Sequence, residues 1–146
     1  MPLRRTSKNA KMDLLRGVSL FSACSHRELS RIASLADEID APRGKVLTRE
    51  GEPGREFFVV VDGRARATVG DRTRVAPLGP GSSFGEMSLL DQGLRSATVT
   101  AETDMRLLVL ESRSFSALIE EVPSVTRKLL RVLAERLRVA EREAVH

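Results

Sequence analysis

The spacing of apolar positions predicts helices in the first forty residues. The apolar residues that would cover the first helical segment are Leu14, Leu15, Val18, Leu20 and Phe21. Ser25 and Glu28 fit a capping box, in which a hydroxyl and a carboxylate satisfy backbone amides, so a second helix should begin there. Its apolar positions, at helical spacing, are Leu29, Ile32, Ala33 and Ala36. The following segment, IDAPRGK, indicates a change to extended chain.

From about Lys45 to Glu111 the pattern changes to short apolar runs broken by turn residues, which is typical of β structure. The run FFVVV predicts a buried strand, Asp62-Gly63 a hairpin turn, and ARATV the alternating partner strand. On that partner Ala65, Ala67 and Val69 would share one face, and Arg64 and Arg66 would point outward. SATVTA and MRLLVLE would supply the closing strands. These runs predict a jelly-roll-like β-roll.

After Glu111 the pattern returns to helix, first in SRSFSALIEE and then in a longer segment with Pro123 near its first turn. The apolar stripe of this last helix has 3, 4, 3 spacing and consists of Leu130, Leu133, Leu137 and Ala140. Such a stripe fits a dimer seam, a lid over a ligand, or plain packing against the roll. The predicted fold class is therefore α+β, a β-roll flanked by N-terminal helices and a long C-terminal helix.

Length and composition fit one globular domain. The chain has 146 residues, is 41% hydrophobic, and contains no apolar stretch of roughly 20 residues that would span a membrane. MPLRRTSKNAK has no apolar core of a secretory signal, and Cys24 is the single cysteine, which together favour a cytoplasmic location. We expect residues 1–12 to form a flexible basic tail and residues 13–146 the folded domain.

The net charge of +4 comes from 24 basic residues, 20 of them arginine, set against 20 acidic ones. They are spread along the sequence, as solvated surface charges are. The cluster from Arg4 to Lys11 is the exception. It could contact nucleic acid or acidic lipid, or it could be a disordered end.

The run Gly85 to Ala97, GEMSLLDQGLRSA, could build a small anionic-ligand site. Phe84 would close a strand, Gly85 would let the backbone turn, and one or two helical turns would follow from Glu86 to Leu90. Amides at the start of that helix favour an anion such as phosphate, and Arg95 would donate further hydrogen bonds to it. A carboxylate at Glu86 would repel phosphate unless it faced a hydroxyl group such as that of ribose.

These residues resemble a known family. FGEMSLLDQGLRSATV is similar to the phosphate-binding cassette of cyclic nucleotide-binding domains, found in catabolite activators and protein kinase A regulatory subunits, and EGEPGREFFVVVDGRARA is similar to the family's glycine-punctuated first half. The resemblance implies that Arg95 pairs with the cyclic phosphate and Glu86 with the ribose hydroxyl. The implied ligand-binding residues are Phe84, Gly85, Glu86, Met87, Ser88, Arg95, Ser96 and Ala97. Leu94 departs from the family's proline, which leaves the loop less constrained.

The resemblance further implies a ligand, cAMP in preference to cGMP, and a C-terminal helix that closes over the base and transmits occupancy. The implied base pocket consists of Ala67, Val75, Arg136, Leu137 and Ala140. The helix would act on an effector protein or form a homodimer. Because the chain stops at His146, we expect no appended DNA-binding module and no direct DNA binding.

No CxxC, HExxH, GxSxG or P-loop motif occurs, so we expect no catalysis, no metal and no cofactor. Two alternatives remain open. The domain could be a ligand-free scaffold in which Glu86 pairs with Arg95, or the sensor arm of a longer regulator.

Overall fold

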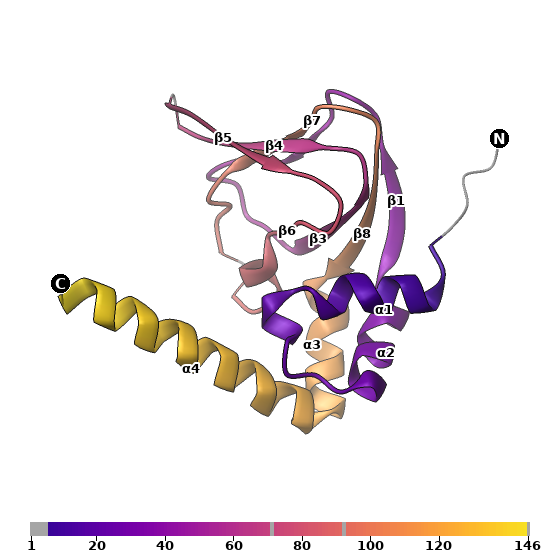
Figure 1. Ribbon diagram of the computed structural model, residues 1–146, viewed down its shortest axis with the longest axis vertical. Helices are drawn as coiled ribbons and strands as arrows, with labels where there is room; N and C mark the ends of the chain where they lie inside the picture. Colours follow the sequence, from indigo (N-terminus) through magenta and orange to yellow (C-terminus); the bar gives the residue numbers. More distant parts are fainter. Residues whose placement is uncertain (1–5, 71, 92, 146) are drawn as a thin grey trace.

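The computed structural model describes residues 6–70, 72–91 and 93–145 and has the predicted α+β architecture (Figure 1). A β-roll lies above a group of helices made by the two ends of the chain. The helices are α1 (Lys8–Arg16), η1 (Ser19–Phe21), α2 (His26–Leu35), η2 (Glu86–Leu89), α3 (Ser112–Glu121) and α4 (Pro123–Val145). The strands are β1 (Asp37–Ala41), β2 (Val46–Thr48), β3 (Glu56–Asp62), β4 (Ala65–Val69), β5 (Arg72–Leu78), β6 (Ser83–Phe84), β7 (Thr98–Ala101) and β8 (Met105–Glu111).

Two four-stranded antiparallel sheets form the roll, in the orders β1-β8-β3-β6 and β2-β7-β4-β5. The predicted hairpin between residues 57–61 and 65–69 is wrong, because β3 pairs with β8 and β6 and so has no free edge for β4. The turn at Gly63 instead leads the chain from one sheet to the other. Gly63 has a φ of 88°, where a Cβ would lie 2.4 Å from the carbonyl oxygen of Asp104.

Strand β3 separates two apolar cores because its side chains alternate. Phe57 and Val59 face a core shared with the helices, whereas Phe58 and Val60 face the interior of the roll. The prediction that Ala65, Ala67 and Val69 share one face is only partly correct. Ala65 is buried and Ala67 packs against the interior, but Val69 is 47% exposed. The pairing with β5 has a register shift between Ala67 and Val69, so the regular alternation of faces is interrupted there.

Helix α1 begins within the segment that we expected to be a tail. Ser7 caps α1 through its side chain, Lys11 donates to the carbonyl oxygen of Ala36, and Met12 is buried. The folded part therefore includes residues that we expected in a tail ending at residue 12, because one apolar side chain and two polar contacts fix the first turns. The capping box of Ser25 and Glu28 at the start of α2 is confirmed.

Helix α4 begins at Pro123 as predicted, below α3, and extends to the left beneath the roll (Figure 1). Its first turns pack into the helical core through Val125, Leu129 and Val132, while Leu130 and Leu137 are 60% and 61% exposed. Most of the predicted stripe is therefore not used for packing in this conformation. None of the described helices is apolar over a length that would cross a bilayer.

The base of α4 is tied to α2 by the buried carboxylate of Glu28. It accepts hydrogen bonds from the backbone amide of Ser25 at 2.7 Å and the hydroxyl of Ser124 at 2.5 Å, and it forms an ion pair with Lys128. Burial alone would raise the pKa of Glu28, but the hydrogen bonds from Lys128, Ser124 and Ser25 lower it to about 2. Burial and the charge of Glu28 raise the pKa of the nearby Cys24 thiol to about 11, so Cys24 stays protonated and packs as a small apolar group.

Candidate ligand-binding site

A cavity of about 720 Å³ opens where the chain passes from β6 through η2 to β7. All eight residues that the resemblance implied as ligand-binding line it, from Phe84 through Ser88 and from Arg95 through Ala97. Arg95 is the only cation among the described lining residues, and Glu86 and Asp91 are the anions. The cavity thus brings one positive group and two carboxylates together among small, hydroxyl-bearing and apolar residues.

Gly85 makes the turn into η2 possible. Its φ is 82°, in the left-handed region that side chains disfavour, and a Cβ there would lie 2.9 Å from the carbonyl oxygen of Glu56 and 2.5 Å from Nη1 of Arg95. The predicted helical turn after Gly85 is confirmed as the 3-10 helix η2, and within the described part of the chain no side chain caps its first turn. Its opening amides are therefore not committed to a capping side chain.

The guanidinium of Arg95 contacts a hydroxyl group and an aromatic ring. Nη1 donates a 2.8 Å hydrogen bond to the hydroxyl of Ser88, which is 7% exposed. The guanidinium carbon lies 6.0 Å from the centre of the Phe58 ring, at the limit of a cation–π contact. Burial lowers the pKa of Arg95, and the carboxylate of Glu56 opposes that effect. Arg95 remains charged, because an arginine does not lose its proton in a protein.

The loop before Arg95 is fixed by backbone hydrogen bonds in place of the family's proline. The amide of Arg95 donates to the carbonyl of Glu52 at 2.8 Å, and the carbonyl of Arg95 accepts from Gly51 at 2.9 Å. Pro53 and Leu94 form an antiparallel bridge, and the side chain of Leu94 is 70% exposed. The missing proline therefore does not leave this loop unsupported.

Glu86 does not pair with Arg95. Its carboxylate accepts a 2.9 Å hydrogen bond from Nη1 of Arg136 on α4, and Arg136 also donates to the hydroxyl of Ser19 in η1. This contact connects the cavity to the C-terminal helix. The pair of Glu86 and Arg95 that the scaffold alternative assumed is therefore not formed in this structure.

The predicted base pocket is not assembled in this conformation. Ala67 packs in the interior of the roll, and the side chain of Val75, in β5, lies outside the described residues. Arg136 reaches the edge of the cavity through Glu86, whereas Leu137 and Ala140 are exposed and do not line it. Their role as base contacts stays a prediction.

Other lining residues gave no signal in the sequence. Ser19 and Gly17 come from the N-terminal segment, and Thr48 comes from β2, where its hydroxyl donates to the carbonyl of Ala97 at 3.0 Å. These residues lie far from the cassette along the chain and meet it only through the pairing of β2 with β7 and the packing of η1. A hydroxyl-bearing residue on a short strand is too common to be recognised beforehand.

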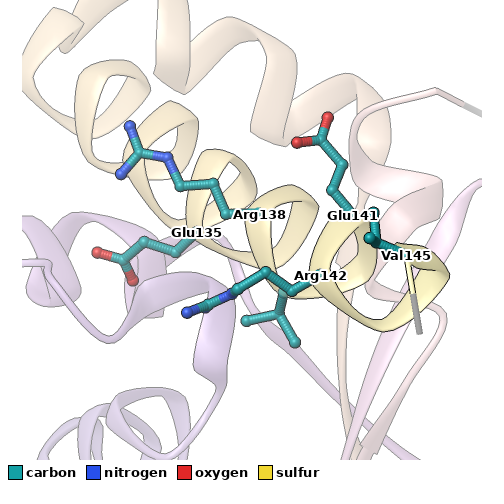
Figure 2. Close-up of a pocket in the computed structure, with 6 residues that line it drawn as sticks. Glu135, Arg138, Glu141, Arg142 and Val145 are labelled. Carbon is teal, nitrogen blue, oxygen red and sulfur yellow. The ribbon is translucent and has the colours of Figure 1, made fainter.

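A second hollow, of about 770 Å³, lies along the C-terminal half of α4. Figure 2 shows that the side chains around it, such as Glu135, Arg138 and Arg142, come from one helix and splay to different sides. Among the described residues, no other element forms an opposing wall and no polar groups converge on it. Among the described residues, no cluster of three or more histidine, cysteine or acidic side chains could hold a metal ion.

The fold and the cavity define a β-roll domain with a polar cavity beside a C-terminal helix. The sequence pattern of the family described as "Cyclic nucleotide-binding domain" matches residues 38–122, more than half of the chain. The chain therefore belongs to the cyclic nucleotide-binding domain family.

Two of the similar proteins are longer than this chain. The chain is 37% identical to the cyclic AMP receptor protein of Thermus thermophilus over 88% of its own length and 62% of the relative's. It is 36% identical to a putative potassium channel protein of Rhodopseudomonas palustris over 82% of its length and 29% of the relative's. Among solved structures, the N-terminal domain of a transcriptional regulator from Streptomyces coelicolor matches with a TM-score of 0.83 and 33% identity, covering 90% of this chain and 95% of that one. The chain spans about three fifths of the receptor it matches.

Proposed function

We propose that this domain is a cyclic nucleotide sensor that binds cAMP in preference to cGMP and converts occupancy into the position of α4. The observation that carries the proposal is the separation of Arg95 and Glu86 in one cavity. A cation held by Ser88 faces the space where a phosphate would lie, and a carboxylate tied to Arg136 faces the space of a ribose hydroxyl. The preference for cAMP is supported by the relatives, one of which is a cyclic AMP receptor protein.

The proposed ligand contacts follow from the lining. Arg95 would donate to the cyclic phosphate, and the amides of Gly85, Met87, Ser96 and Ala97 would complete the cradle. The amide of Ser88 already donates to the carbonyl of Gly85 at 3.0 Å. Glu86 would accept from the ribose hydroxyl. Arg136 lies one residue from Leu137 and one helical turn from Ala140, so a small movement of α4 about its tethered base would bring that face toward the base of the nucleotide.

The output of the domain is a proposal of the same kind. Occupancy would act on a second copy through the exposed stripe of α4 or on an effector protein. The chain covers 62% and 58% of the first two relatives, a receptor and a transcriptional regulator, which favours the sensor arm of a longer regulator as an alternative setting. In either setting we expect the domain itself to be non-catalytic and located in the cytoplasm.

Thermal unfolding with and without nucleotide tests the proposal. At about a hundredfold excess over its dissociation constant, a ligand that binds only the folded state stabilises it by ~2.7 kcal/mol. We expect cAMP to raise the melting temperature more than cGMP, and 5′-AMP, which lacks the cyclic phosphate, to leave it unchanged. If neither cyclic nucleotide raises it, the proposal is wrong.

A further inference from the structure

The side chain of Arg95 passes close to the backbone of Gly54 and Gly85. It contacts the ring of Phe58 and the hydroxyl of Ser88. A Cβ on Gly54 would lie 2.4 Å from Nε of Arg95 and 2.6 Å from its Cδ and Cζ atoms. A Cβ on Gly85 would lie 2.5 Å from Nη1. The guanidinium therefore occupies space that exists only because both neighbouring positions lack a side chain.

The two glycines differ in why they are needed. Gly85 has a positive φ, so the backbone alone favours glycine there. Gly54 has no such conformation, and the three nearest atoms that a Cβ on it would meet all belong to Arg95. Its amide donates to the carbonyl of Gly93 at 3.1 Å, a bond that alanine would keep. The absence of a side chain at Gly54 thus serves the path of Arg95.

Ser88 fixes the far end of that path. It is buried, it stands in η2, and its hydroxyl accepts the 2.8 Å hydrogen bond from Nη1 of Arg95. A serine hydroxyl that accepts from arginine still has its own proton to donate. One charge-assisted hydrogen bond therefore sets the direction of the guanidinium. A carboxylate partner would neutralise its charge, whereas a hydroxyl group does not.

We propose that Gly54 and Ser88 are positioning residues that hold the Arg95 guanidinium in its ligand-facing orientation before any nucleotide arrives. The inference rests on the proposed function, because it assigns how the cation of that site is prepared. Ordering a long side chain costs conformational entropy. Where folding has already ordered it, ligand binding no longer carries that cost and becomes tighter.

The test compares Gly54→Ala and Ser88→Ala with two matched controls. Gly79→Ala adds a methyl group where nothing lies within 4 Å, and Ser34→Ala removes an exposed hydroxyl on α2. The first readout is the Nε–H resonance of Arg95 in the ligand-free protein, assigned by its absence in Arg95→Leu. The second is the dissociation constant for cAMP from titration calorimetry, and a thermal melt reports the fold of every variant.

We expect the Arg95 resonance to be distinct in the wild type and in both controls. In Gly54→Ala and Ser88→Ala it should move toward the exposed arginines, and cAMP affinity should fall about tenfold, as loss of an ordered contact to a charged group predicts. The melting temperature should change little, because the displaced atoms belong to the flexible end of a side chain.

The outcomes separate this inference from the proposed function. If the wild type binds cAMP, Arg95→Leu does not, and both alanine variants bind like the wild type, Gly54 and Ser88 are not positioning residues although the site stands. If the wild type binds no cyclic nucleotide, the function fails, and an unchanged Arg95 resonance in the folded alanine variants overturns the positioning role as well. If Gly54→Ala does not melt cooperatively, it is not folded, and the resonance and the cAMP affinity of Ser88→Ala then decide whether the positioning role holds.

Discussion

Arg136 of α4 and Glu86 of η2 are joined by a 2.9 Å ion pair, 50 residues apart in sequence, at the edge of the candidate cavity. Both side chains are partly exposed, at 35% and 26%. The carboxylate that we assign to the ribose hydroxyl is therefore also the contact of the C-terminal helix. In the proposed complex, ligand and helix would meet at one side chain, which is the simplest physical basis for coupling occupancy to helix position.

We expect Arg136→Gln to weaken cAMP binding, because it leaves the charge of Glu86 uncompensated near the cyclic phosphate. The pair is partly solvated, so the effect should be modest, about threefold. In a Glu86→Gln background the same change should have almost no effect, since the charge that it balances is gone. Calorimetric titration of the four proteins measures this, and additive losses would contradict the coupling. Hydrogen exchange should also show faster opening of α4 beyond Leu133 in Arg136→Gln.

Arg95→Leu should abolish cyclic nucleotide binding and leave the fold cooperative. Arg95 is the only cation among the described lining residues, so its loss leaves Glu86 and Asp91 to repel the phosphate. The fold should tolerate leucine, because removing a partly buried cation also removes its desolvation cost. Calorimetry and urea unfolding measure the two effects, with Arg66→Leu, on the exposed face of β4, as control. Unchanged affinity in Arg95→Leu would refute the assigned role.

The buried carboxylate of Glu28 should make stability depend on pH in the acid range. Its pKa is about 2 in the folded protein against an ordinary 4.5, so the unfolded chain binds the proton more tightly. The stabilisation is complete above about pH 4.5 and is lost as the pH falls toward 2. Glu28→Gln should lower the free energy of unfolding at pH 7 by about 2 kcal/mol and flatten this acid slope.

Urea unfolding at a series of pH values checks this prediction. Glu121→Gln is the matched control, because its carboxylate makes an exposed ion pair with Arg31 at 3.3 Å and should contribute little. An acid slope that persists in Glu28→Gln would assign the effect to other carboxylates.

Features encoded in neighbouring residues could be predicted from the sequence. The capping box at Ser25 and Glu28, the glycine turn into η2 and the start of α4 at Pro123 depend on contacts within one or two turns, and all three are present. The run from Phe84 to Ala97 is also encoded locally, since the turn and the loop that form much of the cavity wall belong to one segment. Local chemistry at fixed spacing is therefore enough to identify the candidate site.

Features set by long-range pairing could not be predicted. The sheet partner of residues 65–69 depends on which strand edge is free, and β3 is occupied by β8 and β6. The role of Gly54 depends on the path of a side chain 41 positions further along the chain. Likewise, the amphipathic pattern of α4 does not say which of its apolar faces packs, and Leu129 rather than Leu130 enters the core.

The exposed stripe of α4 should mediate self-association. Leu130 and Leu137 are 60% and 61% exposed and, with Leu133 and Ala140, follow the 3, 4, 3 spacing of a coiled-coil seam. Exposed leucines in such a row have a hydrophobic reason to meet a second copy. Leu137→Glu should therefore shift the protein toward monomer in sedimentation velocity and leave its melting temperature at low concentration unchanged.

Val139→Glu is the matched control for this last prediction. It introduces the same charge within the same turn, at a residue that is 45% exposed but lies off the stripe, two positions further on and so on another face of the helix. It should leave the association constant near that of the wild type. If the wild type stays monomeric at every concentration, with and without cAMP, the stripe is not a seam between copies and α4 must act on a different partner. If both variants weaken association equally, the contact involves the whole end of the helix, because only a defined seam distinguishes Leu137 from Val139.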